Sequence, residues 1–410
     1  MALLYNFGIR IYFALIFLAS FFNPKAKLWI KGRKNIFKNI LEIIPKNEEI
    51  VWFHSASLGE FEQGRSIIEN FKKENPNYKI LLTFFSPSGY EIRKNYPGAD
   101  YIFYLPIDTK RNAKKFIDII NPKLVYFIKY EFWFNYINQL YRKQIPTFIV
   151  SANFRNDQHF FKWYGGWFRN QLQKITYFFV QNEKSKSLLN TIGIQNVIVS
   201  GDTRFDRVYE ITKEEKSFPL IEKFCENKNI LIAGSTWPED EEILLKHFVS
   251  HSNDYKLIIA PHEVHSERIE ALIKSSSESM QRFSGLNESN ALESHILIID
   301  SIGILSHLYK YGNISFIGGG FGKGIHNILE AATFGLPIIF GPSYEKFQEA
   351  KDLIELKGAV SISNFEEYSC ALNNFLIPEK MEIAGNISKK YVADKVGATK
   401  MILEETKKFL

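Results

Sequence analysis

The chain has 410 residues, of which 45% are hydrophobic and 23% are charged, and its formal net charge is +6. This length suits two domains with full cores, and the composition excludes a fibrous or low-complexity protein. The two cysteines, Cys225 and Cys370, lie far apart in dissimilar surroundings, which argues against a disulfide framework or a zinc site and fits a reducing cytoplasm.

The N-terminal segment is a nearly continuous apolar run over residues 3–22, interrupted only by Asn6 and Arg10. Residues 25–38 then carry six Lys or Arg residues and no acid. Because the positive charge follows the apolar run, a cleaved signal peptide is not expected. The run has about the minimum length for a bilayer span, so a single anchor, an interfacial helix and a buried first helix are the alternatives. The flanking charge favours membrane association, with the basic segment on the cytoplasmic face.

From residue 50 onwards, short apolar runs alternate with helical patterns. The first series predicts strands at 50–54, 79–84, 101–104, 124–129, 147–151, 177–181 and 197–200. After a charged stretch at 212–217, a second series predicts strands at 229–233, 257–260, 296–299, 314–317, 337–340 and 360–362. Continuous apolar strands that alternate with helices are typical of parallel sheets covered on both faces.

This pattern predicts an α/β protein with two doubly wound domains, joined near residues 205–225, and a ligand cleft between them. The expected segments are an anchor with its basic stretch at 1–40, a first domain at 41–212 and a second domain at 213–385. A last helical segment, 386–410, follows, and its return to the first domain is left open.

Polar residues follow several strands of the first series. The sequence HSASLGE (54–60) indicates a strand end, a turn of small residues and a helix with Glu60 in its first turn. Glu60 is either a capping acid, favoured by the helix dipole, or a functional carboxylate at the ligand-binding edge of an open α/β sheet. Glu131 follows another strand, either as a helix cap or as a site residue. Arg155 suits bidentate contact with phosphate or carboxylate, and Arg204 follows the last strand beside the expected hinge.

The run FFKWYGGWFR (160–169) mixes aromatic residues with cations. This composition is compatible with ordinary core. It also suits a surface at the level of lipid headgroups or the mouth of a lipid-binding site.

The strongest chemical signal of the second half is GGGFGKGIHNILE (318–330). We expect a strand that ends in glycines and a helix that begins there, exposing backbone N–H groups and a positive helix end toward an anion. The alternative is a glycine turn that merely packs tightly. Five glycines within seven residues, followed by His-Asn, favour phosphate binding. Glu330 would then lie about one turn into the helix and accept hydrogen bonds from ribose hydroxyls.

Three further strand ends carry polar or small residues. In GSTWPEDEE (234–242), Ser, Thr and the acids are what ordinary helix caps use. In APHE (260–263), the single His262 is of a kind more often structural than catalytic. The third is GPSYEKFQE (341–349), a turn. Together with the glycine run, these ends indicate one nucleotide site.

The ordered set of HSASLGE (54–60), AGST (233–236), GGG…GIHNILE (318–330) and FGP…FQE (340–349) resembles the 3-deoxy-D-manno-octulosonic acid (Kdo) transferases of lipopolysaccharide synthesis. The resemblance extends from the N-terminal apolar run to nearly the last helix. It implies two Rossmann-like halves in a GT-B arrangement, CMP-Kdo as donor and a phosphorylated lipid A precursor (lipid IVA) as acceptor. The implied reaction is an inverting, metal-independent glycosyl transfer at the cytoplasmic face of the inner membrane.

Residue by residue, the resemblance makes Glu60 the general base that deprotonates the acceptor hydroxyl, and Gly59 the point where the backbone approaches the sugar. The family's nucleotide-sugar positions fall on Ser235, Thr236, Gly319, Gly320, His326, Asn327 and Glu330, and we add His262 and Gly324 to this donor side. The family's positions facing the cleft fall on Glu131, Arg155 and Arg204, and we add Ser57 to this acceptor side.

Four places depart from the usual family pattern. Trp237 stands where His is frequent, and Pro261-His262-Glu263 replaces Pro-Arg-His. Ser343 stands where His often follows Gly-Pro, and Lys346 where Asn often precedes Phe. These departures concern contacts to the donor phosphate and the Kdo carboxylate, while the reaction class is unaffected.

Two other classes of protein remain as alternatives. One is another sugar-nucleotide enzyme of the same fold, a UDP-sugar transferase or epimerase. Competition of CMP and of UDP with the donor would distinguish it from a Kdo transferase. The other is a non-catalytic membrane protein that binds a nucleotide sugar or lipid without forming product. The resemblance implies no cofactor and no metal. A nucleic-acid partner is not expected, because the positive charge collects beside the apolar run. The number of Kdo residues transferred, the preferred acceptor acylation and the oligomeric state stay open.

Overall fold

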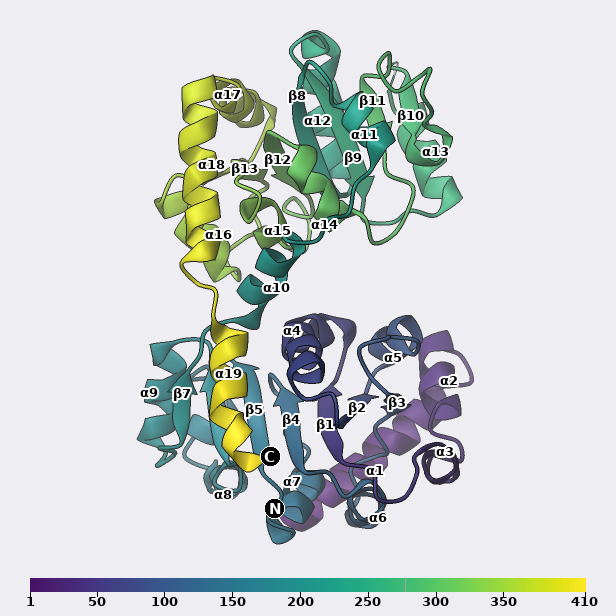
Figure 1. Ribbon diagram of the computed structural model, residues 1–410, viewed down its shortest axis with the longest axis vertical. Coiled ribbons are helices and arrows are strands. Elements are labelled where there is room, and N and C mark those ends of the chain that lie inside the picture. Colours follow the sequence, from purple (N-terminus) through teal and green to yellow (C-terminus); the bar gives the residue numbers. More distant parts are fainter. Residues whose placement is uncertain (277) are drawn as a thin grey trace. The chain divides into compact units, whose positions relative to one another are not determined.

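The computed structural model describes residues 1–276 and 278–410, which form two compact units (Figure 1). The first unit contains Met1–Arg207 together with Gly397–Leu410, and the second contains Val208–Val396. Each unit is built around a seven-stranded sheet whose neighbouring strands are parallel. The predicted α/β class with two parallel-sheet domains is confirmed.

The first sheet has the strand order β3-β2-β1-β4-β5-β6-β7. Its strands are β1 (Ile50–Ser55), β2 (Lys79–Phe84), β3 (Tyr101–Tyr104), β4 (Leu124–Ile128), β5 (Thr147–Ala152), β6 (Tyr177–Val180) and β7 (Val197–Val199). All seven strands predicted for the first series exist, with ends within one residue of the prediction. The order reverses between β1 and β4, and the loops at such a switch point form the usual ligand site of an open α/β sheet.

Side chains of β1 alternate between two hydrophobic cores, because successive residues of a strand point to opposite faces. Trp52 lies in the core covered by α6 (Lys110–Ile120) and α7 (Phe134–Arg142). Phe53 lies in the core covered by α4 (Leu58–Glu74) and α19 (Ala398–Thr406). The other helices of this unit are α1 (Ala2–Ala19), α2 (Pro24–Lys31), α3 (Ile36–Ile43), α5 (Pro87–Arg93), α8 (Gly166–Leu172), α9 (Glu183–Thr191) and the start of α10 (Thr203–Ile211), with short 3₁₀ turns η1 (His159–Phe161) and η4 (Lys407–Phe409).

The C-terminal helix α19 belongs to the first unit although it follows the whole second unit in sequence. The hydroxyls of Ser66 and Thr399 lie 2.9 Å apart, and those of Tyr126 and Thr406 lie 2.6 Å apart. Asp206 accepts hydrogen bonds from the backbone N–H groups of Gly397 and Thr399 at 2.7 and 2.9 Å. These buried contacts attach the end of the chain to the helix α4 side of the first sheet.

The second sheet has the order β10-β11-β9-β8-β12-β13-β14. Its strands are β8 (Asn229–Thr236), β9 (Tyr255–Pro261), β10 (Met280–Arg282), β11 (Ile296–Ile298), β12 (Ile314–Ile317), β13 (Ile338–Phe340) and β14 (Ala359–Ser361). Its helices are α11 (Pro219–Phe224), α12 (Pro238–His251), α13 (Ser266–Lys274), α14 (Leu305–Leu308), α15 (Leu329–Ala332), α16 (Gln348–Glu355), α17 (Phe365–Phe375) and α18 (Pro378–Ala393), with 3₁₀ turns η2 (Phe283–Gly285) and η3 (Tyr309–Tyr311). The sequence prediction omitted edge strand β10, whose half-buried Met-Gln-Arg lacks an apolar run.

The helix after the glycine run differs from the prediction. Residues 318–323 form turns, and α15 begins only at Leu329 and spans four residues. A Cβ on Gly320 would lie 2.5 Å from the backbone nitrogen of Gly341, so this part of the chain follows the neighbouring turn closely. Glycine is also a poor helix former. The prediction that a helix begins at the glycines is therefore wrong, and Glu330 is the second residue of a short helix instead.

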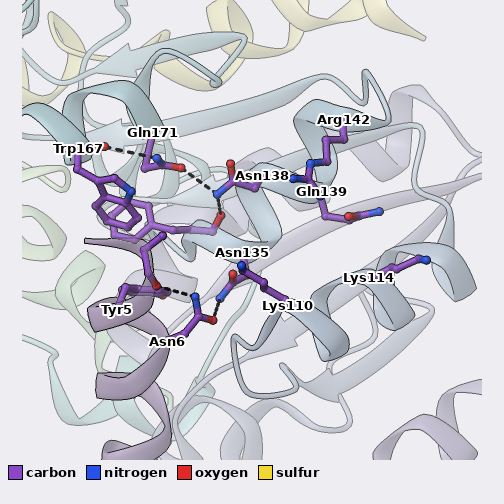
Figure 2. Close-up of a pocket in the computed structure, with 12 residues that line it drawn as sticks. Tyr5, Asn6, Lys110, Lys114, Asn135, Asn138, Gln139, Arg142, Trp167 and Gln171 are labelled. Atoms are coloured by element: carbon purple, nitrogen blue, oxygen red, sulfur yellow. Dashed lines mark hydrogen bonds between the residues drawn. The ribbon is translucent and has the colours of Figure 1, made fainter.

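Helix α1 is long and apolar enough to cross a membrane, and none of its residues is buried. At its N-terminal end, it borders a cavity of about 400 Å³ that is also lined by α6, α7 and α8 (Figure 2).

Candidate active site

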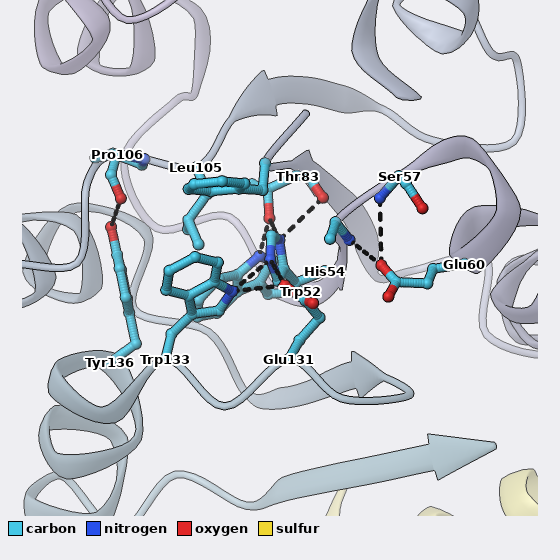
Figure 3. A network of polar contacts seen from close by, with 12 residues as sticks. Trp52, His54, Ser57, Glu60, Thr83, Leu105, Pro106, Glu131, Trp133 and Tyr136 are labelled. Carbon is cyan, nitrogen blue, oxygen red and sulfur yellow. Dashed lines mark hydrogen bonds and ion pairs between the residues drawn. The ribbon is translucent and has the colours of Figure 1, made fainter. Parts of the chain in front are cut away.

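Glu60 lies in the first turn of α4, directly after the turn that ends β1 (Figure 3). Its Oε2 accepts hydrogen bonds from the backbone N–H groups of Ala56 at 2.6 Å and Ser57 at 3.2 Å. Among the described residues, none donates a hydrogen bond to Oε1. The carboxylate thus caps its own helix with one oxygen, and its other oxygen remains available to a ligand.

The pKa of Glu60 is raised from 4.5 to about 7. The main cause is burial, which disfavours the charged form, and the second is the nearby carboxylate of Glu131. The N–H groups of Ala56 and Ser57 and the charge of Lys129 act in the opposite direction. A carboxylate with this pKa accepts a proton near neutral pH more readily than an ordinary glutamate.

Glu131 belongs to a buried network that the sequence did not reveal (Figure 3). His54, the fifth residue of β1, contacts Glu131 Oε2 through Nε2 at 3.0 Å and the backbone oxygen of Thr83 through Nδ1 at 3.1 Å. The indole N–H of Trp133 donates to Glu131 Oε2 at 2.7 Å. Nδ1 of His54 also lies 2.8 Å from the hydroxyl of Thr83, which can donate or accept. His54 and Trp133 together hold the Glu131 carboxyl in one position beside Glu60.

The other acceptor-side candidates lie at the same edge of the first sheet. Burial raises the pKa of Tyr130, and Arg155, Asp202 and Glu60 act on the same phenol electrostatically. Arg155 is exposed and pairs with Asp157 at 3.5 Å. Arg204 is half-buried, and its Nη2 lies 2.8 Å from Asp202 Oδ2. Tyr130 thus lies within electrostatic reach of Glu60, Arg155 and Asp202, the partner of Arg204.

Ser57 and Gly59 lie in the turn itself and contribute little to packing. Ser57 is half-buried, and Gly59 is exposed. A Cβ on Gly59 would meet nothing within 4 Å. The fold does not require a glycine here, which leaves close approach of a ligand as a reason for it.

Three non-glycine residues at strand ends have left-handed backbone conformations. They are Lys129 after β4 (φ 63°), Ser151 near the end of β5 (φ 54°) and Ser235 near the end of β8 (φ 54°). The pairings of β5 with β6 and of β8 with β9 shift register at Ser151 and Ser235. Such conformations cost about 1 kcal/mol or more and concentrate at functional sites. Both units thus carry backbone strain at the carboxyl edge of the sheet.

In the second unit, Asp240 joins two of the predicted donor-side turns. Its Oδ2 accepts hydrogen bonds from the N–H groups of Trp237 at 2.8 Å and Gly319 at 2.9 Å. Burial raises the pKa of Asp240 to about 6. Sequence reasoning assigned Asp240 only the role of a capping acid, because its contact with Gly319 spans 79 residues of the chain. Gly319 itself has φ +88°, a conformation that favours glycine.

Three aromatic rings stack beside these turns. Trp237 stacks on His262 with ring centres 4.9 Å apart, and His262 stacks on His326 at 4.4 Å. The indole N–H of Trp237 donates to Nε2 of His326 at 3.2 Å. Burial, and then the neighbouring His262, lower the pKa of His326 to about 4. His326 is therefore neutral at physiological pH and accepts a hydrogen bond.

The remaining donor-side candidates lie on the same turns. Thr236 is buried and donates to Glu241 Oε1 at 2.8 Å, whereas Ser235 is half-buried. Asn327 donates to Glu330 Oε1 at 3.0 Å and accepts from the N–H of Leu329 at 3.2 Å, so it caps α15. Gly324 donates to the backbone oxygen of Gly319 at 3.2 Å and closes the glycine turn.

Ser343 and Lys346, two of the residues that depart from the family pattern, differ in their exposure. The backbone N–H of Ser343 donates to the oxygen of Gly320 at 2.9 Å, whereas Lys346 is exposed. Within residues 1–276 and 278–410, no group of three or more His, Cys, Asp or Glu residues is arranged to hold a metal ion.

Sequence reasoning assigned no role to His54 or Trp133 and only a capping role to Asp240. Their only sequence signal was proximity to motifs already selected: His54 opens the HSASLGE run, Trp133 follows Glu131 closely, and Asp240 follows the AGST run.

Comparison with known proteins finds one family of transferases by sequence. A model of the family described as 3-deoxy-D-manno-octulosonic-acid transferase (kdotransferase) matches residues 31–207. A 3-deoxy-D-manno-octulosonic acid transferase of Rickettsia bellii is 30% identical over 90% of this chain and 88% of its own length. One from Aquifex aeolicus is 29% identical over 80% of this chain and 87% of its own.

Solved structures resemble the fold. A UDP-GlcNAc 2-epimerase from Neisseria meningitidis has a TM-score of 0.60 at 16% identity and covers 88% of this chain and 100% of its own. A glycosyltransferase from Rickettsia africae has a TM-score of 0.56 at 12% identity and covers 88% of this chain and 99% of its own. At these identities the similarity concerns the fold, which is shared by transferases and epimerases that act on nucleotide sugars.

Proposed function

The chain belongs to the 3-deoxy-D-manno-octulosonic acid (Kdo) transferase family, and from this premise we propose that it transfers Kdo from CMP-Kdo to a lipid A precursor with inversion. It is a glycosyltransferase of lipopolysaccharide synthesis. The family supplies the reaction class, and the residues at the carboxyl edges of the two sheets supply the roles proposed below.

Glu60 is the proposed general base, and its geometry is the observation that carries the proposal. Two backbone N–H groups hold Oε2, and Oε1 accepts no hydrogen bond from any residue that the structure describes. A pKa of about 7 leaves a substantial fraction of Glu60 ionised at neutral pH and makes the carboxylate a stronger proton acceptor than usual.

In the proposed step, Oε1 of Glu60 takes the proton from a sugar hydroxyl of the acceptor. The hydroxyl oxygen then forms a bond to the anomeric carbon of Kdo, and the bond from that carbon to the phosphate oxygen breaks. The electron pair leaves with CMP, and the proton stays on Glu60 until it passes to solvent. Attack opposite the leaving group inverts the anomeric configuration.

The second unit is the proposed donor site. The turn around Gly320 suits a phosphate, since clustered backbone N–H groups form anion-binding concavities, whereas the N–H of Gly319 is bound to Asp240. Neutral His326 offers a ring for stacking, and Glu330 offers acceptors for ribose hydroxyls. Stabilisation of the departing phosphate by such fixed donors requires no proton transfer.

Helix α1 is the proposed membrane contact, and the proposed location of the enzyme is the cytoplasmic face of the inner membrane, beside its lipid acceptor. Leu4, Phe7, Leu15 and Leu18 expose between 59% and 66% of their surface. A soluble surface rarely carries so many large apolar side chains on one helix.

The test is an assay of the purified full chain with CMP-Kdo and a tetra-acylated lipid A precursor, read by product mass. We expect addition of Kdo residues, inhibition by CMP rather than UDP, and activity that survives a chelator. Product from a UDP-sugar, or epimerisation of one, would contradict the proposal, and so would donor binding without any product.

A further inference from the structure

Helix α1 contacts the rest of the first unit near its start and near its middle. Near its start, the hydroxyl of Tyr5 donates to Asp108 Oδ2 at 2.5 Å, and the Tyr5 ring packs on Phe134 with centres 5.0 Å apart. Further along, Tyr12 stacks on Phe85 at 6.1 Å, and Phe13 packs on Trp29 at 6.2 Å. A helix held from Tyr5 to Phe13 presents one side to the domain and its apolar side outward. This arrangement fits a helix that lies in the membrane interface rather than one that crosses the bilayer.

The cavity beside the N-terminal end of α1 is strongly cationic (Figure 2). Lys110 and Lys114 of α6 and Arg142 of α7 line it, and none of its twelve lining residues is an acid. Lys174 also donates to Gln171 Oε1 at 2.8 Å and to Asn138, two of the lining residues. Within the described ranges of the chain, Lys110, Lys114 and Arg142 form no ion pair with an acid.

The charge of Arg142 also acts on the neighbouring Lys174. Burial, and then the charge of Arg142, lower the pKa of Lys174. An anionic ligand in the cavity would offset the repulsion between Arg142 and Lys174. The lining amides, among them Asn135 and Gln139, provide further donors around such a ligand.

The position of the cavity indicates where the anion comes from. Ala2, Tyr5 and Asn6 of α1 form one wall, and Asn6 accepts a hydrogen bond from Asn135 at 3.1 Å. Their neighbours Leu3 and Leu4 are 83% and 66% exposed. A phosphate in the cavity would therefore have an apolar surface beside it for attached acyl chains. Soluble phosphate would gain nothing from that surface.

We propose that this cavity binds the phosphate headgroup of an anionic bilayer lipid that is not the acceptor, and that the bound lipid fixes α1 in the plane of the membrane. The proposal rests on the membrane association proposed above. It also accounts for the aromatic run at 160–169, because Trp167 lines the cavity and aromatic side chains favour the headgroup level. The site uses α1, α6, α7 and α8 and shares no residue with the turn that carries Glu60.

The first experiment measures binding of the full chain to vesicles of phosphatidylcholine, with and without phosphatidylglycerol. We expect the wild type to prefer the anionic vesicles, and the triple variant Lys110→Gln, Lys114→Gln, Arg142→Gln to lose roughly tenfold or more of that binding. Equal binding of the wild type to both vesicles would overturn the headgroup site and leave membrane association intact. Absence of binding to either would overturn both proposals.

The second experiment separates a built site from diffuse attraction. Gln139→Trp fills the cavity without changing charge, so we expect it to abolish binding of soluble dihexanoyl-phosphatidylglycerol. The control variant Lys25→Gln, Lys27→Gln, Lys34→Gln removes three exposed cations near α1 and should retain that binding. Retention by Gln139→Trp, or loss in the control, would overturn the proposal.

Competition identifies the source of the phosphate. We expect inorganic phosphate and the lipid A precursor to displace dihexanoyl-phosphatidylglycerol poorly. Displacement by inorganic phosphate at equal concentration would mark a free-anion site. Displacement by the precursor, with a raised acceptor KM in Gln139→Trp, would mark an acceptor subsite. Either result would overturn a lipid other than the acceptor as the ligand.

Discussion

The two units have the same architecture but carry different chemistry at the carboxyl edges of their sheets. In the first unit, the edge collects titratable groups: Glu60 with its pKa near 7, and the buried pair of His54 and Glu131. In the second unit, it collects closely packed glycines and the rings around His326, which its lowered pKa keeps neutral. In the proposed function, the first edge moves a proton, and the second holds a ligand without a change of charge.

The largest expected effect is the loss of the first edge's base. Glu60→Gln retains an oxygen that accepts from Ala56 and Ser57, so we expect a folded protein. Without a proton acceptor, kcat should fall roughly a hundredfold to ten-thousandfold. The measurement is Kdo transfer under saturating substrates, together with thermal unfolding. Glu74→Gln, at the exposed end of the same helix, is the control and should keep full activity. Near-normal turnover by Glu60→Gln would assign the base elsewhere.

A pair of glycine substitutions tests the contrast in packing. A Cβ on Gly320 would lie 2.5 Å from the backbone of Gly341, so Gly320→Ala should destabilise the second unit by about 1–3 kcal/mol. A Cβ on Gly59 meets nothing within 4 Å, and Gly59→Ala should leave stability unchanged or raise it by up to about 1 kcal/mol. Denaturant unfolding measures both.

The same pair separates stability from function. We expect Gly59→Ala to raise the acceptor KM, because the added methyl group occupies the space that a sugar would approach. Full activity in Gly59→Ala would show that the open space beside Gly59 is not used by the substrate.

The pH dependence tests the electrostatics of the first edge. Glu60 must be ionised to act as a base, so kcat/KM should fall as pH drops through about 7 instead of about 4.5. Glu131→Gln removes the second cause of the raised pKa, so the acid limb should move to lower pH whatever the loss in maximal rate. Arg155→Gln is the control, because Arg155 is not one of the causes of the raised pKa of Glu60. The acid limb of its pH profile should stay near pH 7. A limb that stays near pH 7 in Glu131→Gln would contradict the coupling.

The raised pKa also has a consequence for stability. Because the folded state holds the Glu60 proton more tightly than the unfolded state, this group favours folding at low pH. That contribution is lost as pH rises from about 4.5 to about 7. Glu60→Gln should therefore gain thermal stability relative to the wild type at pH 8, and the difference should shrink as the solution is acidified.

The sequence predicted the fold better than it predicted the partners of the site residues. The pattern of apolar runs in the sequence located all seven strands of the first sheet, because buried parallel strands are continuous apolar runs. In the second sheet, only the polar edge strand β10 was omitted from the prediction. Glu60 and the glycine run were found from turn chemistry and from family resemblance. The contact of His54 with Glu131 and that of Asp240 with Gly319 span 77 and 79 residues. Local pattern contains no information about such pairs, which follow from sheet order.

The smallest expected effect concerns the ring stack of the second edge. Trp237→Phe keeps a ring over His262 but removes the N–H that donates to His326 at 3.2 Å. A partly exposed hydrogen bond of this kind contributes about 0.5–1.5 kcal/mol, so the donor KM should rise roughly twofold to tenfold while kcat changes little. Trp237→His, which restores the residue frequent at this position in the resemblance, is the matched variant and should recover donor affinity if its ring nitrogen reaches His326. A fall in kcat comparable to that of Glu60→Gln would mean that the second edge takes part in the chemical step. That result would contradict the proposal that the second edge only binds the donor.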